Sequence, residues 1–288
     1  MKKAILLFII LIIGFSAEAM CGWSGIRVWP SQKNISTNSI FIIEGYGQSQ
    51  ELIKQLNKKN KIYLKCNSEI VPIKVIRILE GQYRLTQAIL KPERELRSGK
   101  TYELHIDSLG KIDKSEYEVV KWTVNSINDD EKPVWNCEPT YKTQRYVGYG
   151  CGPERYVYFC GSYNDNSPTV IYAKVFDKTN ETSSDYFITS EDNKISIGHG
   201  MCAGEFTFDD ESNYEVQFGL MDASGNENLA LTSPIHFTSP TEDNQSDLEF
   251  NCSCNEKSSL LIYCFLVLGL IVVILLVSIK LYKRKKSI

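Results

Sequence analysis

The chain has 288 residues, of which 43% are hydrophobic and 23% are charged. This composition lets the chain bury a core and excludes an intrinsically disordered protein. Sixteen Tyr and twelve Phe against four Met favour β-sheets over a helix bundle. Together with the two terminal segments, these numbers argue against a cytosolic enzyme and against a polytopic transporter.

The N-terminal segment has the pattern of a secretory signal peptide. Two lysines precede an uncharged apolar run over 4–15, and small residues follow at the two positions that a signal peptidase reads. We therefore predict a signal peptide over 1–19 with cleavage after Ala19. A short membrane anchor is an alternative, but the run is too short to span a bilayer core of about 30 Å. A lipoprotein cysteine at Cys21 is a second alternative, opposed by Glu18 where an apolar residue is required.

The C-terminal segment predicts one transmembrane helix. Residues 260–279 form a run of twenty uncharged residues, and at about 1.5 Å per residue this run reaches about 30 Å. Five basic residues follow within 280–288, and such clusters stay on the cytoplasmic side. The chain is thus expected to be a single-pass protein with most of its mass outside the cytoplasm and a short basic cytoplasmic tail.

The part between the two ends is acidic. Of 32 Lys and Arg residues, two lie in the predicted signal peptide and five in the tail, which leaves 25. Of 35 Asp and Glu residues, one lies in the signal peptide, which leaves 34 and a net charge of −9. Binding of nucleic acid is therefore not expected, because phosphate contacts need a basic face. Attraction to basic partners and a merely solvated acidic surface are both compatible with this charge.

Strand patterns recur through the middle of the chain. Apolar and polar residues alternate in 102–107, 118–124 and 214–220, the period of a half-buried strand. The gaps hold turn-forming residues, and only 48–57 and 92–96 suggest a helical turn. Many short strands at this spacing predict an all-β fold made of β-sandwiches. The other strand candidates are 39–43, 61–66, 70–78, 83–90, 156–160, 169–176 and 203–208.

A polar segment over 125–133, which ends in Pro133, divides these strands into two groups. We therefore predict two tandem domains, over 20–126 and 127–240. An acidic stalk over 241–259 is expected to lead to the membrane.

Three segments resemble bacterial immunoglobulin-like domains of the Big and fibronectin-III-like kinds. Pro30–Ile35 before the apolar run Ser39–Ile43 resembles their opening, and Leu96–Leu104 resembles their late "L-x-x-G-x-x-Y-x-L" strand. Asp222–Asn226 resembles the D-x-x-G-N turn before their last strand, where Gly225 and Asn226 can take positive φ. The resemblance implies two immunoglobulin-like β-sandwiches whose usual roles are spacing, adhesion and surface display, although a fold does not imply a function.

The chain has nine cysteines, and an oxidising compartment makes disulfides the default for those outside the membrane. The first predicted domain holds two cysteines, and the second holds four, which allow three pairings. In the second domain, a bridge between the first two cysteines would close a glycine-rich loop, and a bridge between the last two would clamp two strands. We expect the bridges Cys21–Cys66, Cys137–Cys151 and Cys160–Cys202.

Cys252 and Cys254 lie in the predicted stalk. A Cys-x-Cys element before an apolar helix and a basic cluster resembles the C-terminal sorting signals of some Gram-negative surface proteins. The resemblance implies cleavage near the cysteine and transfer of the protein to the outer surface. A permanent anchor is the alternative, because the glycine-rich approach of such signals is missing.

No motif predicts catalysis or a cofactor. His199 and Cys202 are too few ligands for zinc, and a nucleophile elbow, a phosphate loop and a dinucleotide fingerprint are all missing from the sequence. Asp129 and Asp130 at the domain junction, and Asp165 in a loop, are weak calcium candidates. Asx turns explain the same residues without a metal.

The sequence therefore predicts a non-enzymatic, membrane-anchored protein of the cell envelope or surface. Its immunoglobulin-like domains would serve adhesion, spacing or protein–protein interaction, with a protein or a surface polymer as partner. An envelope assembly factor, or an enzyme with an unrecognised site, is the alternative.

Overall fold

The computed structural model describes residues 21, 24–107, 120–126, 128–150, 152–244 and 250–252. The predicted signal peptide, transmembrane helix and basic tail lie outside the described residues. Among the helices of the described part, none is long and apolar enough to cross a membrane. The described residues up to Cys252 belong to one compact unit. Its sheets fall into two groups, which we call lobe 1 (24–126) and lobe 2 (134–252), with residues 128–133 in the segment between them.

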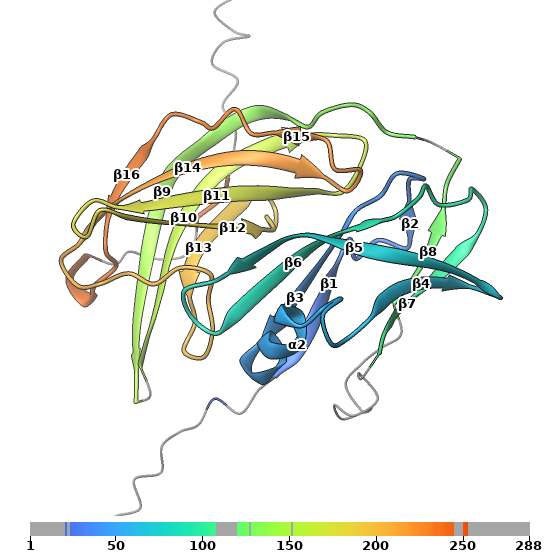
Figure 1. The fold of residues 1–288 in the computed structure, drawn as a ribbon. Helices are drawn as coiled ribbons and strands as arrows, with labels where there is room; N and C mark the ends of the chain where they lie inside the picture. Colours follow the sequence, from blue (N-terminus) through green and yellow to red (C-terminus); the bar gives the residue numbers. More distant parts are fainter. Residues whose placement is uncertain are drawn as a thin grey trace, which may run out of the picture. The chain divides into compact units, whose positions relative to one another are not determined.

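Lobe 1 is an eight-stranded sheet that folds over its own core (Figure 1). The strand order is β1-β3-β6-β5-β4-β7-β8-β2. The long strand β5 makes the fold possible, because its first residues pair with β4 and its later residues pair with β6 across a register shift. The elements are β1 (Gly25–Trp29), β2 (Asn34–Ile35), β3 (Phe41–Tyr46), η1 (Gly47–Ser49), α2 (Gln50–Lys54), β4 (Ile62–Cys66), β5 (Glu69–Glu80), β6 (Leu85–Pro92), β7 (Thr101–Ile106) and β8 (Lys121–Val124).

Lobe 2 contains a three-stranded sheet of order β13-β10-β9 and a second sheet of order β12-β11-β14-β15, in which β16 also pairs with β14. All of its strand pairs are antiparallel. The long hairpin of β9 and β10 extends beyond the other strands of the lobe (Figure 1). The elements are β9 (Val134–Tyr149), β10 (Gly152–Asn164), β11 (Thr169–Asp177), β12 (Thr182–Ile188), β13 (Lys194–His199), β14 (Asn213–Asp222), β15 (Glu227–Asn228), β16 (Ile235–Thr238) and η3 (Glu242–Asn244).

The described part is mostly β-sheet, and the coarse prediction of a β-rich fold is confirmed. The predicted helical turn over 48–57 is present as η1 and α2. Two local predictions are wrong. Residues after Pro92 form bends rather than a helical turn, because the Leu96 amide donates to the Thr37 carbonyl. Residues 203–208 are irregular rather than a strand, although Phe206 and Phe208 alternate as buried residues.

The core of lobe 1 is centred on Trp122. Its side chain is 1% exposed, and the Trp122 and Phe41 ring centroids lie 4.4 Å apart. The indole N–H donates to the Pro30 carbonyl at 3.0 Å, so the one polar atom of this buried ring is satisfied. Alternation along β8 and β3 thus turns Trp122 and Phe41 toward the same core.

The two lobes share an apolar interface, because strands β3 and β6 are buried on both faces. Phe41 and Leu90 face the core of lobe 1, whereas Ile42 and Ile89 pack with the core of lobe 2. The Gln87 side-chain amide also donates to the Phe187 carbonyl of β12 at 2.8 Å. The lobes therefore pack against each other, and the predicted domain boundary after residue 126 stays a prediction.

The turn Asp222–Asn226 fits the expected backbone only in part. Gly225 has a φ of +82°, as expected, but Asn226 does not have a positive φ. The Asn226 side-chain amide instead donates to the Asp222 carboxylate and to the Asp129 carbonyl, each at 2.8 Å. Asn226 therefore ties the turn to the segment between the lobes, and of the two residues that can take a positive φ only Gly225 does so.

Replacing Gly225 with alanine is expected to lower the free energy of unfolding by about 2 kcal/mol. A non-glycine residue at positive φ costs about 1–2 kcal/mol, and the new Cβ would lie 3.1 Å from Ile40 Cγ2. Gly99→Ala is the matched control, since its φ is +71° but its Cβ would meet nothing within 4 Å. Urea denaturation should show the larger loss for Gly225→Ala, and equal losses would contradict the contact with Ile40.

Two disulfides connect distant parts of the chain. Cys21 bonds to Cys202, and Cys160 bonds to Cys252. The expected bridges Cys21–Cys66 and Cys160–Cys202 are therefore wrong. Cys66 is a buried free thiol at the end of β4, whereas Cys21 reaches lobe 2. Of the other cysteines in our prediction, Cys151 and Cys254 lie outside the described residues, which leaves Cys137–Cys151 a prediction.

The end of the described chain lies on the outer face of the three-stranded sheet of lobe 2. The Phe250 ring lies 5.8 Å from the Tyr158 ring, and the Lys194 ammonium lies 4.9 Å from the Phe250 ring centroid. Two residues later, Cys252 bonds to Cys160 of β10. Asn244 also accepts a hydrogen bond from Gln144 of β9. The described residues of the predicted stalk over 241–259 are thus attached to lobe 2.

Candidate functional site

Three carboxylates converge where the two lobes meet. Asp129 lies in the segment between the lobes, Asp165 in the loop from β10 to β11, and Asp222 at the end of β14. One oxygen of each lies within 4.8 Å of the others, and Asp129 and Asp222 are buried. The structure thus brings together two of the three calcium candidates. The third, Asp130, is exposed outside this group and accepts a hydrogen bond from Asn128 at 3.0 Å.

Each of these carboxylates also stabilises its own turn. Asp222 Oδ1 accepts the amides of Ser224 and Asn226 at 2.8 Å, and Asp129 and Asp165 accept amides one or two residues later. These are Asx turns, so the alternative drawn from the sequence is present in the geometry. Carboxylates are also the ligands that calcium prefers, and calcium binding stays a prediction. The sequence reading missed Asp222 because its turn motif explained it.

Burial changes the acidity of this group. It raises the pKa of Asp222 to about 6, against the effect of hydrogen bonds donated by Asn226 and Ser224, and the charge of Asp165 adds to the rise. Burial also raises the pKa of Asp165. Asp222 therefore takes up a proton under mildly acidic conditions, where an exposed aspartate would stay ionised.

The Asp222 carboxyl is expected to make the fold more stable at pH 5 than at pH 7 by about 1 kcal/mol. Its folded pKa of about 6 lies above the ordinary value of 3.8. The stabilisation that the Asp222 carboxyl contributes is therefore fully present below about pH 4 and is lost as the pH rises through 6. Asp222→Asn should remove this part of the pH dependence. Urea denaturation of the wild-type and variant proteins at pH 5 and at pH 7 measures it as the change in the free energy of unfolding between the two pH values. Equal pH dependence in both proteins would show that Asp222 is not the titrating group.

A polar groove of about 440 Å³ adjoins this cluster, and Asp129 forms part of its wall. Its lining is rich in amide and carboxylate oxygens. Such a surface suits hydrated or hydrogen-bonding ligands. The lining residues are Asn34, Ile35, Ser36, Asn125, Asn128, Asp129, Asp130, Glu131, Asn166, Ser167, Pro168 and Ala223.

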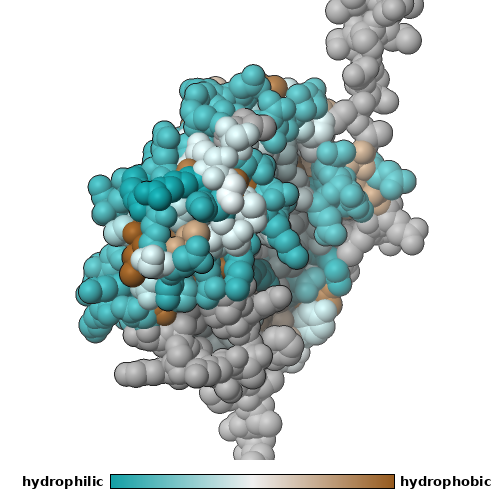
Figure 2. All heavy atoms as spheres, turned by 90° about the vertical axis from the view of Figure 1, so that its right-hand side faces the viewer, coloured by the Kyte–Doolittle hydropathy of each residue, from teal (hydrophilic) through white to brown (hydrophobic). Residues whose placement is uncertain are grey.

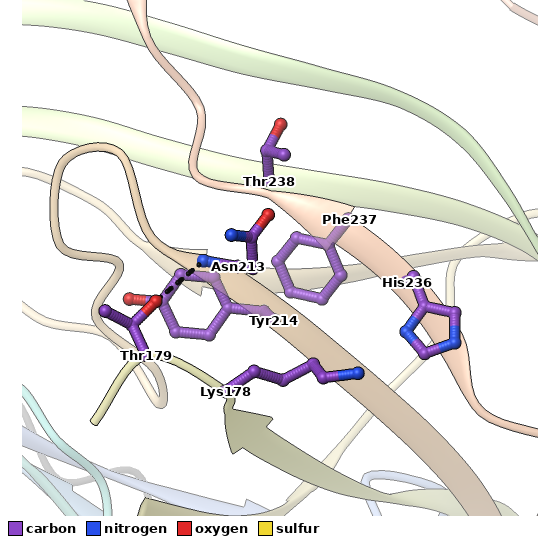
Figure 3. A pocket seen from close by; sticks show the side chains of 7 residues that line it. All are labelled: Lys178, Thr179, Asn213, Tyr214, His236, Phe237 and Thr238. Carbon is purple, nitrogen blue, oxygen red and sulfur yellow. Dashed lines mark hydrogen bonds between the residues drawn. The ribbon is translucent and has the colours of Figure 1, made fainter. Parts of the chain in front are cut away.

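A second hollow, of about 430 Å³, lies beside β14 and β16 (Figure 3). The rings of Tyr214 and Phe237 are stacked with centroids 5.5 Å apart. Lys178 and His236 also line it, and each has a side-chain nitrogen 3.4 Å from the Glu215 carboxylate. The Lys178 ammonium that lines the hollow is therefore already paired with Glu215.

His199 and Cys202 do not form a reactive pair, because Cys202 is bonded to Cys21. A cysteine sulfur that is bonded in a disulfide cannot form a thiolate and therefore is not a nucleophile. The Nδ1 atom of His199 lies 3.0 Å from the Gly200 carbonyl, and burial lowers the pKa of this histidine. His199 is therefore a neutral, buried residue beside the Cys21–Cys202 bridge.

No family model matches the chain, and no curated protein matches it. A pullulanase type I from Bacillus subtilis complexed with maltose is 10% identical over 73% of this chain, which spans 28% of that structure, with a TM-score of 0.23. A cytokine receptor complex is 7% identical over 76% of this chain and 99% of that chain, with a TM-score of 0.24. The N-terminal Ig1-2 module of the Drosophila receptor protein tyrosine phosphatase DLAR is 13% identical over 75% of this chain and 99% of that chain, with a TM-score of 0.21. Likenesses at this level carry no argument about the function of this chain.

Proposed function

We propose that this protein is a membrane-anchored ectodomain that binds a macromolecular partner outside the cytoplasm and has no enzymatic activity. Its β-sheets would form a rigid immunoglobulin-like scaffold, held near the membrane by the C-terminal segment. The partner would be a protein or a surface polymer at the cell envelope. More finely, we propose that the scaffold is of the bacterial immunoglobulin-like kind and that the membrane anchor is permanent, with a cleaved sorting signal as the alternative.

The pair of long-range disulfides carries the proposal. Cys21 follows the predicted signal peptide by two residues, and Cys252 precedes the predicted transmembrane helix by eight. Both are bonded to lobe 2. Disulfides persist in oxidising compartments, which agrees with secretion through the signal peptide. A fold closed by disulfides just inside both predicted targeting segments suits an ectodomain.

The surface supports a binding role through polar contacts. The face of the molecule shown in Figure 2 is mainly hydrophilic, with hydrophobic residues scattered over it. The segment between the predicted targeting ends carries the net charge of −9 derived from the sequence. A surface of this kind recognises partners through charge and hydrogen bonds rather than through one large apolar patch.

An envelope assembly factor or an enzyme with an unrecognised site is the alternative. Purified protein that converted a cell-wall or lipid substrate would favour it over the proposed binding role. A free Cys202 thiol beside His199 would have supported the enzyme, but Cys202 is bonded to Cys21.

Protease treatment and photo-crosslinking in the native cells test the proposal. We expect protease added to intact cells, or to cells with a permeabilised outer membrane, to degrade lobes 1 and 2. A photo-crosslinking amino acid at exposed Ile76 or Tyr141 should join the chain to one reproducible partner, whereas one at buried Phe218 should not. Full protection from protease under both conditions would contradict an extracytoplasmic ectodomain.

A further inference from the structure

A cavity of about 340 Å³ lies between the two lobes, at the lower end of the range for small-ligand sites. Strand β1, with Arg27 and Trp29, and Glu44 of β3 form one side. Tyr186 of β12 and Glu205, from the segment before β14, belong to the other side. Among the described strands, β1 pairs only with β3 and β12 pairs only with β11, so the cavity opens between two sheet edges.

The carboxylate of Glu44 already has its partners. Tyr186 donates its hydroxyl to Glu44 Oε2 at 3.0 Å, and the Gln87 side-chain amide donates to the same oxygen at 3.2 Å. The guanidinium of Arg27 lies 3.4 Å from Glu44 Oε1 and covers the Tyr46 ring. The Arg27 side chain is 75% exposed, so it marks the solvent side of the cavity. Glu44 is thus a fixed, fully bonded group.

Glu205 is different, because its carboxyl group makes no ion pair or hydrogen bond with another residue in the described part of the chain. Among the described residues, its carboxyl accepts a hydrogen bond only from its own backbone amide. The carboxyl is partly buried, and the Glu44 carboxylate and Tyr186 ring of the same cavity lie within its electrostatic reach. A buried carboxylate without a partner is costly. The cavity therefore presents an acid whose cationic partner is missing from the described residues.

We propose that this inter-lobe cavity binds a lysine or arginine side chain of a partner polypeptide, with Glu205 as the residue that pairs with the basic group. Three observations support this proposal. The Glu205 carboxyl is unpaired, the Glu44 carboxylate lines the same cavity, and the rings of Tyr186 and Trp29 border it. Aromatic faces and carboxylates together favour ammonium and guanidinium groups. The acidic charge of the region between the predicted targeting segments would also attract a basic partner. This inference rests on the proposed binding function and names the chemistry of its partner.

The acidity of Glu205 agrees with this role. Burial and the neighbouring Glu44 raise the pKa of Glu205 to about 8, while Arg27 opposes the rise. The groups that face it are Glu44 of β3, Arg27 of β1, Tyr186 of β12 and Tyr156 of β10. A bound cation would favour the ionised carboxylate and release a proton. Binding should therefore tighten by up to about tenfold per pH unit below pH 8 and become constant above it.

Two matched peptides test the proposal on the purified full-length chain. One is acetyl-Gly-Arg-Gly-amide, and the other carries citrulline, which has the size of arginine but no charge. Isothermal titration should show at least tenfold tighter binding of the arginine peptide at pH 8. Arginine is the better probe because its guanidinium stays protonated across this range. Equal affinities for the two peptides, or no binding of either at 10 mM, would overturn the proposal without any variant.

Substitutions locate the site. Glu205→Gln should abolish both the preference for arginine and its pH dependence, while Glu191→Gln, at an exposed glutamate of the same lobe, should change neither. The Glu205→Gln protein should keep its melting temperature at pH 7, because the carboxyl it replaces is largely protonated there. An unchanged arginine preference in Glu205→Gln would place the binding elsewhere and reject the proposal.

Failure of this inference can be distinguished from failure of the proposed function. If the photo-crosslinked partner is captured equally by wild-type protein and Glu205→Gln, the binding function stands and the cavity has no part in it. If no partner is captured by wild-type protein, the binding function fails, and the peptide titration still decides whether the cavity selects a basic side chain.

Discussion

Replacing Cys160 and Cys252 together with alanine is expected to lower the free energy of unfolding by about 4 kcal/mol. The bond closes a loop with a sequence separation of 92 residues, and chain-entropy arguments give about this value for a loop of that length. The same change should release Phe250 from Tyr158 and Lys194, which it contacts in the folded chain. Loss of the bridge therefore acts on stability and on the position of the C-terminal segment.

Urea denaturation measures the first effect, and limited digestion with chymotrypsin measures the second. Phe250 should become a cleavage site in the double variant and stay protected in the wild-type protein. Cys66→Ala is the control for loss of a cysteine without loss of a bridge, since Cys66 is a free buried thiol, and it should cost about 1 kcal/mol. If the double variant were as stable as Cys66→Ala, Cys160 and Cys252 would not be bonded in the native protein.

Replacing Trp122 with alanine should cost about 4 kcal/mol. Removing a fully buried aromatic ring typically costs 3–5 kcal/mol through lost burial and the cavity left behind. In this protein the change also leaves the Pro30 carbonyl without the indole N–H that donates to it and leaves Phe41 without its packing partner. The effect is expected in equilibrium denaturation followed by circular dichroism.

Trp122→Phe separates the two contributions, because phenylalanine keeps an aromatic ring against Phe41 but lacks the N–H donor. We expect a loss of about 2 kcal/mol for this variant. Both variants should unfold in one transition, since Ile42 and Ile89 of lobe 1 pack in the core of lobe 2. Two separate transitions in the wild-type protein would contradict this energetic coupling of the lobes.

The strands that could be predicted are those with one apolar face. Alternation in 102–107 and 214–220 marks β7 and most of β14, because one face of each strand packs on a core. Strand β9 was missed. It is a sixteen-residue edge strand whose side chains are mostly exposed or half-buried, so its pairing with β10 leaves no apolar pattern in the sequence.

The candidate sites could be predicted less well, because they depend on contacts between distant residues. The Cys21–Cys202 bridge has a sequence separation of 181, and local spacing carries no information about such a pair. Asp129 and Asp165 were recognised as acidic residues in turns, but their approach to Asp222 follows from the packing of the turns of lobe 2 against each other and against the segment before β9. Glu205 lies in an irregular segment that resembled a strand, so its place in a cavity could not be read from periodicity.

The attachment of Cys252 to β10 has a mechanical consequence. A pulling force applied at the C-terminal side of Cys252 passes through the Cys160–Cys252 bond directly into β10. The intervening chain, with strands β11 to β16, lies inside the closed loop, which the Cys21–Cys202 bond also joins to the N-terminal end of lobe 1. Tension between the predicted anchor and a partner bound to lobe 1 would therefore divide between the β9–β10 hairpin, the inter-lobe interface and the Cys21–Cys202 bond.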